Sequence, residues 1–145
     1  MLKRSLPAAV VVVAVSFMLM GCGPDYTPRA RVEGDAMMVV LCAPIDAARI
    51  EMLVGPGGSD PYDSDPRWVA EGSHTFGAGD GFTVGVAPSG MKELAPVESF
   101  DPDLDRIAIR IVSGATGEDV QVSEWKAGAI PSEQWSNGSA TEPCT

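Results

Sequence analysis

The chain of 145 residues is poor in basic and in metal-binding side chains. It has one histidine, three cysteines, and 10 lysines and arginines against 20 aspartates and glutamates, for a net charge of −10. A nucleic-acid-binding protein needs a basic face to neutralise phosphates, and this balance argues against one. One histidine and three cysteines also leave few ligands for a zinc site. We therefore expect neither a nucleic-acid partner nor a cofactor.

The sequence also lacks the residue sets of common hydrolases. His74 is the only histidine, and there is no Gly-x-Ser-x-Gly motif to position a nucleophile. Catalysis by a serine or cysteine needs a base that orients the nucleophile. Paired carboxylates could hydrolyse glycosides, but three Trp, two Tyr and four Phe supply little for a sugar platform. We predict that the protein is not an enzyme and that His74 lies in a surface loop.

The first residues form a short basic segment followed by an apolar one. Lys3 and Arg4 precede residues 8–20, where Ser16 is the only polar residue. A membrane-spanning helix needs about 20 apolar residues, so this run is too short to span. A positive start followed by a short apolar run is typical of a secretory signal peptide. We predict that residues 1–21 are a signal peptide.

The end of this segment reads Leu19-Met20-Gly21-Cys22 and resembles the lipobox of bacterial lipoproteins. The resemblance implies that the Cys22 thiol receives a diacylglyceryl group and that a peptidase cuts before it. Met20 departs from the family pattern, in which small or β-branched residues are commoner. Two acyl chains anchor a protein stably. Residues 22–30 would then be the lipidated cysteine and a short linker, and the protein would lie on the extracytoplasmic face of the cell membrane.

Removal of the signal peptide would leave two cysteines other than the lipidated one, Cys42 and Cys144. An exported compartment permits disulfides, and two cysteines allow only one pairing. We expect a Cys42–Cys144 bond that attaches the C-terminal tail to an early strand. Loss of Lys3 and Arg4 would also change the net charge from −10 to −12.

Residues 31–145 have the pattern of a single all-β domain. Short apolar or alternating runs are separated by turn residues, since the chain has 16 glycines and 12 prolines. We predict strands at 36–42, 49–54, 82–86, 106–112 and 119–125, with a further strand at 68–70. Residues 49–54 could instead form a short helix capped by Asp46 and stopped by Gly55. The expected fold is a small antiparallel β-sandwich, immunoglobulin-like in broad shape.

The hydrophobic pattern also predicts which side chains face the core. The unbroken apolar run 36–42 favours a strand buried on both faces, and the alternation in 82–86 turns Phe82, Val84 and Val86 inward. In 106–112 the three isoleucines lie on one side and the two arginines on the other. Residues 119–125 begin with the same alternation, which breaks at Glu124-Trp125 and indicates a bulge or an edge.

Two acidic segments, Asp60–Asp65 and Asp101–Asp105, place carboxylates two residues apart in turn-like sequence. Calcium binds six to eight oxygens from such loops. The second segment begins like an EF-hand loop, but Arg106 and Val112 stand where a glycine and a bidentate glutamate are needed. We predict no metal site. The weak candidates for a non-standard calcium site are Asp101, Asp103 and Asp105, and the alternative is that these aspartates form turns.

The glycine-rich and tryptophan-containing segments have structural interpretations. Residues 77–81 (Gly-Ala-Gly-Asp-Gly) precede a strand instead of a helix, so we expect a flexible hairpin loop and no phosphate loop. Trp68 and Trp125 are expected in the core. Trp135 lies in a polar tail, which either folds back over the sandwich or presents an exposed anchor for a partner.

These features favour a non-enzymatic, lipid-anchored binding or interaction module of the cell envelope. Its negative charge favours a cationic partner, such as a basic envelope protein. Alternatives are an inhibitor of a basic envelope-degrading enzyme such as a muramidase, which the Asp101–Asp105 loop would enter, and a phage- or prophage-encoded surface lipoprotein. Cys42, a tryptophan, the turn Val86–Gly90 and a C-terminal cysteine together resemble small actinobacterial envelope proteins, a resemblance that implies no activity.

Overall fold

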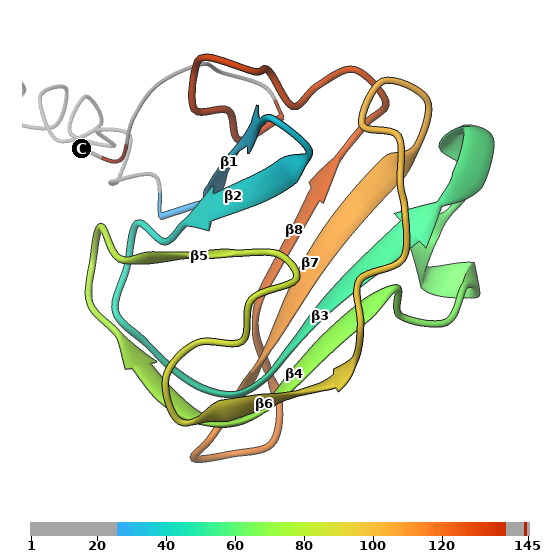
Figure 1. Ribbon diagram of the computed structural model, residues 1–145. Coiled ribbons are helices and arrows are strands. Elements are labelled where there is room, and N and C mark those ends of the chain that lie inside the picture. The colour runs from blue at the N-terminus through green and yellow to red at the C-terminus, as the bar shows by residue number, and fades with distance from the viewer. Residues whose placement is uncertain (1–25, 139–143, 145) are drawn as a thin grey trace, which may run out of the picture.

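Two antiparallel sheets pack face to face in a β-sandwich (Figure 1), which confirms the expected fold. The computed structural model describes residues 26–138 and Cys144. The predicted signal peptide and Cys22 lie outside the described residues. Within the described part, no helix is long and apolar enough to cross a membrane.

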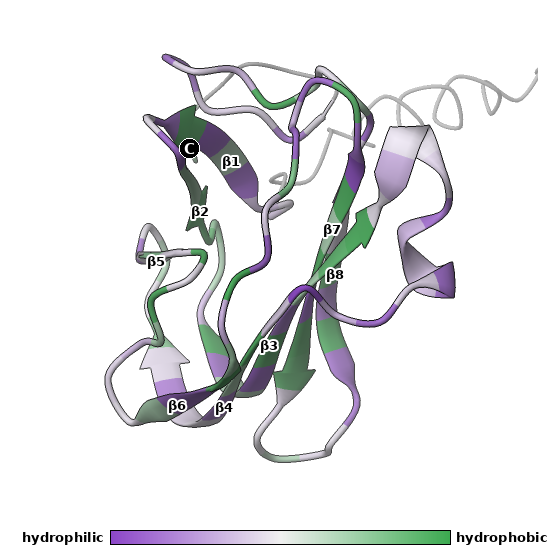
Figure 2. Ribbon diagram, turned by 45° about the vertical axis from the view of Figure 1, so that its right-hand side comes forward, coloured by the Kyte–Doolittle hydropathy of each residue, from purple (hydrophilic) through white to green (hydrophobic). Residues whose placement is uncertain are grey.

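The smaller sheet has the strand order β1-β2-β5 and the larger one β6-β4-β3-β7-β8. The strands are β1 Arg29–Glu33, β2 Ala36–Val40, β3 Ile45–Gly55, β4 Trp68–Phe76, β5 Gly81–Thr83, β6 Met91–Ala95, β7 Arg106–Ser113 and β8 Asp119–Trp125. Two short 3-10 turns follow β3, namely η1 Pro56–Gly58 and η2 Pro61–Asp63. Figure 2 shows the hydrophobic residues concentrated on the strands and the polar residues in most of the loops.

A single hydrophobic core lies between the two sheets. Its largest fully buried side chains come from both sheets and include the expected Trp68 and Trp125. The other large, fully buried side chains are Phe76, Met37, Leu41, Ile50, Met52, Ile107, Ile109, Ile111, Val39 and Val54. Since all these residues lie between 37 and 125, the chain from Pro24 onward contains this core and both cysteines of the disulfide. It has what it needs to fold by itself.

The central strands of the larger sheet, β3 and β7, confirm the strands predicted at 49–54 and 106–112. Residues 49–54 belong to β3, which pairs with β4 on one side and with β7 on the other. The alternative of a helix is wrong, because only an extended chain can bond to neighbours on both sides. Both faces of β3 are buried around Glu51 and Leu53, since η2 packs over the side that faces away from the core.

The prediction for residues 82–86 is wrong at its end. Strand β5 stops at Thr83, and Val86 is 61% exposed instead of facing inward. The Val86 N–H donates to the Thr83 carbonyl at 3.0 Å, which closes a turn with Gly85 at φ +90°. A type II turn requires a positive φ at its third residue, and glycine supplies it without steric cost. The sequence pattern Thr-Val-Gly-Val therefore encodes a turn where alternation suggested a strand.

Two further predictions of facing need correction. Strand β2 is fully buried on one face only, through Met37 and Val39, because Arg31 and Trp135 cover the outward face of the smaller sheet only in part. In β8, Val120 and Val122 are exposed, while Ser123 and Trp125 face the core. In this register Trp125 is fully buried, and its indole N–H donates to the Ser136 carbonyl at 2.9 Å, which a one-residue shift of β8 would prevent. The strand is the edge of the larger sheet, and its irregularity lies opposite Ile111 and Val112, not at Trp125.

The structure also adds strands and moves a boundary. Strands β1 and β6 are additional to the predicted set, and β4 extends well beyond 68–70. Strand β1 pairs with β2 from Arg29, which lies within the expected linker 22–30. Residues 77–81 connect β4 of one sheet to β5 of the other and form no hairpin. His74 lies within β4, not in a loop.

The C-terminal tail folds back onto the free edge of β1, as one of the two alternatives for Trp135 expects. Ala30 and Ser136 form a β-bridge, and the Trp125 indole N–H donates to the Ser136 carbonyl at 2.9 Å. The half-buried Trp135 lies under the Arg31 guanidinium, 4.5 Å from the ring centre. The expected Cys42–Cys144 disulfide is present, with a sequence separation of 102.

Candidate functional site

A connecting segment crosses one side of the sandwich and borders a surface groove. This segment, residues 96–105, joins β6 to β7 and is named the strap. The Glu98 N–H donates to the Arg67 carbonyl at 3.0 Å, and the Gly128 N–H donates to the Pro102 carbonyl at 2.8 Å. The strap is therefore held near its start and just beyond its middle, and in Figure 1 it runs in yellow and orange from β6 to β7.

The strap groove is a cavity of about 730 Å³ between the strap, the β1–β2 hairpin and the turn after β5. Ligand sites commonly measure about 300–1,000 Å³ and are mostly apolar. Met37 and Val84 are buried lining residues, whereas Val86 and Val97 are exposed. The complete lining comprises Val32, Gly34, Asp35, Ala36, Met37, Thr83, Val84, Gly85, Val86, Val97, Glu98, Ser99, Phe100 and Pro102.

Two glycine turns shape this groove. Gly34 has φ +62° and begins the two-residue turn of the β1–β2 hairpin, which places Asp35 at the hairpin tip. Gly85 has φ +90°, and a Cβ built on it would lie 3.0 Å from Val97 Cγ1 of the strap. The strap therefore packs closely against the β5 turn there. No local sequence pattern predicts the groove, because its lining comes from three segments that are distant in the chain: the β1–β2 hairpin, the turn after β5 and the strap.

The charged residues of the groove are acidic. Asp35 and Glu98 contribute to its lining, and no lysine or arginine does. Glu98 forms an ion pair with Arg67 at 2.8 Å, whereas Asp35 is in no ion pair among the described residues. The groove is therefore an apolar cavity with an acidic rim.

The predicted acidic loop Asp101–Asp105 is braced by its own aspartates. Asp101 Oδ1 accepts the Asp103 N–H at 2.9 Å, and Asp105 Oδ2 accepts the Asp101 N–H at 2.9 Å. Asp105 Oδ1 also accepts the Gly57 N–H of η1 at 3.0 Å. These carboxylates bond to backbone donors, as the turn-forming alternative predicts. The loop presents Leu104 with 63% of its surface exposed.

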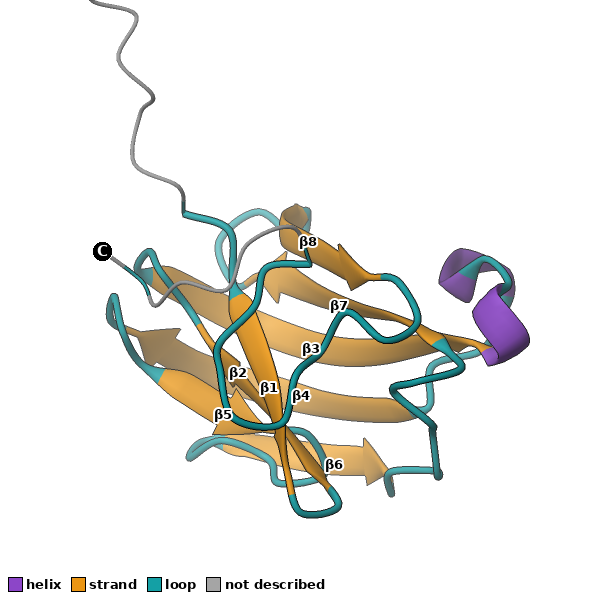
Figure 3. Ribbon diagram, turned by 90° about the horizontal axis from the view of Figure 1, so that it is seen from above, coloured by secondary structure: helices purple, strands orange, loops and turns teal. Residues whose placement is uncertain are grey.

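The second acidic segment lies beside the first, since η1 contacts Asp105. Asp60 caps η2 by accepting the Tyr62 N–H at 2.9 Å, and Asp63 and Asp65 are exposed. Tyr62 is 43% exposed. Burial of its ring raises the pKa of the Tyr62 hydroxyl, and nearby Glu124 adds to the shift, so the group stays neutral at pH 7. We call the two segments together, residues 60–65 and 101–105, the acidic end; Figure 3 shows η1 and η2 at one extremity of the sandwich.

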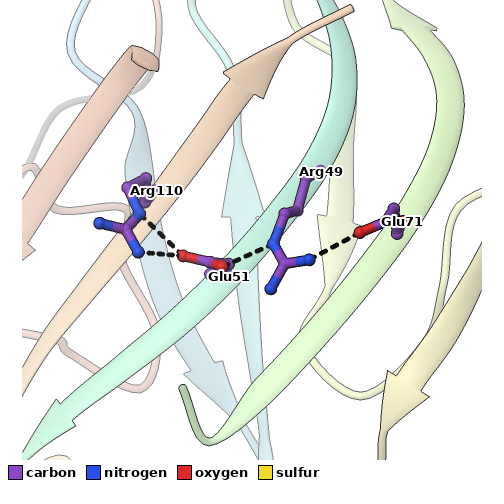
Figure 4. A network of polar contacts seen from close by, with 4 residues as sticks. All are labelled: Arg49, Glu51, Glu71 and Arg110. Carbon is purple, nitrogen blue, oxygen red and sulfur yellow. Dashed lines mark hydrogen bonds and ion pairs between the residues drawn. The ribbon is translucent and has the colours of Figure 1, made fainter. Parts of the chain in front are cut away.

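The outward face of the larger sheet has a different electrostatic character. Glu51, with a side chain only 6% exposed, binds Arg49 at 2.6 Å and Arg110 at 2.7 Å, and Arg49 also binds Glu71 at 2.6 Å (Figure 4). Burial by itself would raise the pKa of Glu51, but the hydrogen bonds from Arg49 and Arg110 outweigh it and the pKa is lowered. Glu51 is therefore charged and fully compensated at neutral pH.

Glutamates and aspartates differ in their roles across the molecule. In the part of the chain that the structure describes, every carboxylate in an ion pair belongs to a glutamate and every partner is an arginine. The aspartates mostly lie in turns and bond to backbone or hydroxyl donors. The arginine charge is thus largely neutralised on the sheets, and the unbalanced negative charge lies on the loops.

His74 has two structural contacts within the fold. Its Nδ1 lies 2.8 Å from the Ser89 carbonyl, and its ring packs edge-on against Phe76 with centroids 4.4 Å apart. Across residues 26–138 and Cys144, no group of three or more His, Cys, Asp or Glu side chains is placed to hold a metal ion. No protein-family model, curated protein or solved structure matches this chain.

Proposed function

We propose that this protein is a lipid-anchored, non-enzymatic binding module of a bacterial cell envelope, and that its acidic end binds a basic envelope protein. The observation that carries the proposal is the separation of charge. The arginines are paired with glutamates, while the acidic end presents aspartates without ion pairs beside the exposed Tyr62 and Leu104. Apolar side chains in such a setting supply contact area, and the charge steers a cationic partner.

The lipid anchor rests on the sequence resemblance of Cys22 and its flanking residues. The fold adds a geometrical argument, because β1 begins at Arg29, only a few residues after the proposed anchor. In Figures 1 and 3 this start of the described chain and the 3-10 turns of the acidic end lie on opposite sides of the sandwich. An anchored domain would then present its acidic end away from the membrane.

The test is affinity capture from envelope extract, with the chain from Pro24 onward as bait and elution by a salt step. A triple variant, Asp63→Asn, Asp65→Asn and Asp103→Asn, removes carboxylates that accept no backbone hydrogen bond in the structure. We expect a basic protein bound to the native bait and lost from this variant. The control removes three charges elsewhere, in Glu93→Gln, Glu118→Gln and Glu133→Gln.

The control should keep the partner, because its changes lie outside the acidic end. Equal retention by both variants would refute the assignment to the acidic end. Equal loss would show that net charge alone attracts the partner, and an empty capture with the native bait would refute the proposal as a whole.

The second candidate function, inhibition of a basic muramidase, is favoured by the braced loop that presents Leu104. A loop that is already rigid in its binding conformation loses little entropy on insertion into a cleft. Leu104→Ser with Asp103→Asn should abolish inhibition of cell-wall lysis while the fold is unchanged. Undiminished inhibition by this double variant would exclude the loop as the inhibitory element.

A further inference from the structure

The strap groove is a second surface, which meets the acidic end at Pro102, and its chemistry indicates a ligand. Its floor is formed by Met37 and Val84, and the exposed Val86 and Val97 lie at its opening. Water in an apolar cavity of this kind finds few hydrogen-bond partners. An aliphatic group that displaces this water gains free energy in proportion to the apolar area it buries.

The charge of the groove discriminates among apolar ligands. Asp35 at the hairpin tip and Glu98 on the strap are acidic residues that line the groove from two different walls, and no lysine or arginine lines it. Glu98 shares its charge with Arg67, which leaves Asp35 as the uncompensated group. A carboxylate ligand would be repelled at this rim, whereas an ammonium group would be attracted.

We propose that the strap groove binds a small aliphatic molecule that carries one positive charge, with its chain between Met37, Val84 and Phe100 and its ammonium group near Asp35. The volume of about 730 Å³ lies within the range of small-molecule sites. The groove is also preformed, because the strap is held by Arg67 and Gly128 and the hairpin by its glycine turn. Binding therefore needs little rearrangement.

The probes for a test share one chain length and differ in charge: n-octylammonium, 1-octanol and octanoate. Each is titrated at pH 7 into the ¹⁵N-labelled chain from Pro24 onward, with its disulfide formed, and amide shifts are followed by NMR. Octylammonium should shift the amides of Met37, Val84 and 97–100 at the lowest concentration, octanol should need more, and octanoate the most. Octanoate binding equal to octylammonium, or an absence of shifts with all three probes, would overturn the proposal.

Two kinds of variant localise the binding. Asp35→Asn should weaken octylammonium about threefold, as expected for one exposed charge pair, and leave octanol unchanged. Asp63→Asn removes the same charge outside the groove and should change neither. An Asp35→Asn variant with undiminished affinity for octylammonium would refute the role of that carboxylate.

The second kind of variant fills the groove with a bulky side chain and so tests whether the probe binds there. Ala36→Phe and, independently, the exposed strap substitution Ser99→Phe should each abolish the shifts with octylammonium. The Ser99 variant leaves the core untouched, so it serves even where Ala36→Phe disturbs the hairpin. Persistent binding by the folded Ser99→Phe protein would place the probe elsewhere and overturn the proposal. None of these outcomes affects the capture experiment, which depends on the acidic end.

Discussion

The two sheets of this sandwich are held together by different means. In the larger sheet, β3 pairs with both neighbours along most of its length, and arginines close over Glu51 on its outward face. In the smaller sheet the strands have three to five residues, and the edge strand β1 is held by the C-terminal tail and fastened near the Cys42–Cys144 bond. The central strands of the larger sheet are held by one another, whereas the smaller sheet depends on a distant segment along its β1 edge.

This difference explains where the open surface lies. In the larger sheet, long paired strands place charged side chains on neighbouring strands next to one another. Glu51 can therefore form ion pairs with Arg49 and Arg110. The short strands of the smaller sheet end early, and the strap covers only part of the gap beyond them. The groove is a consequence of that short sheet.

Removal of the disulfide should have the largest effect on this comparison. Cys42→Ala with Cys144→Ala should lower the free energy of unfolding by about 2–5 kcal/mol, because the bond closes a loop of about 100 residues. Urea unfolding measures the loss, and hydrogen exchange shows where it falls. Amides of β1 and β2 should lose protection in the native state before those of β3 and β7. Equal losses in these two pairs of strands would contradict the idea that the tail holds the smaller sheet more than the centre of the larger one.

A matched pair of glutamate substitutions should separate the two sheets further. Glu51→Gln removes a buried charge and leaves Arg49 and Arg110 without their shared partner, so we expect a loss of about 2–3 kcal/mol. The estimate is at the low end for buried pairs, since both arginines are about one third exposed. Glu33→Gln breaks the exposed pair with Arg31 on the smaller sheet and should cost less than about 1 kcal/mol. Similar losses in urea unfolding would refute the contrast.

Lowering the pH should remove part of the free energy of unfolding that Glu51 contributes. The pKa of Glu51 is lowered in the folded state, so its contribution to stability is fully present above the ordinary glutamate pKa of about 4.3 and is lost as the pH falls below it through the lowered value. Stability measured by urea unfolding should therefore fall less steeply in Glu51→Gln than in the native protein as the pH is lowered from 6 to 3. Identical slopes would show that Glu51 has an unshifted pKa.

The contact between Trp135 and Arg31 should have the smallest effect. A guanidinium 4.5 Å from an indole centre contributes about 0.5–1 kcal/mol when partly exposed. A double-mutant cycle with Trp135→Leu and Arg31→Met should give a coupling energy of this size in thermal or urea unfolding. A coupling near zero would mean that Trp135 covers the smaller sheet by apolar contact alone.

Local patterns in the sequence predicted the parts of the fold that local physics controls. The isoleucines of residues 106–112 alternate with arginines, and the strand follows that alternation. The all-β fold class follows from short apolar runs between glycines and prolines. The two cysteines other than Cys22 allow only one pairing, and the Cys42–Cys144 bond is present. The aspartates of residues 60–65 and 101–105 include turn formers, as their spacing allowed.

The tertiary structure decided what alternation leaves ambiguous. Val86 and Val122 look like core residues in the sequence, but a glycine turn exposes the first and the competing burial of Trp125 exposes the second. Glu51 pairs with Arg110, 59 residues away in the sequence, only because β3 lies beside β7. The lining of the strap groove likewise depends on how the strands are arranged. Hydrophobic period and turn chemistry act between neighbouring residues, so the sequence by itself determined the fold class and most of the strands, but neither β1 nor β6. Charge pairing and cavities arise where segments distant in sequence meet, and only the packing of the two sheets brings those segments together.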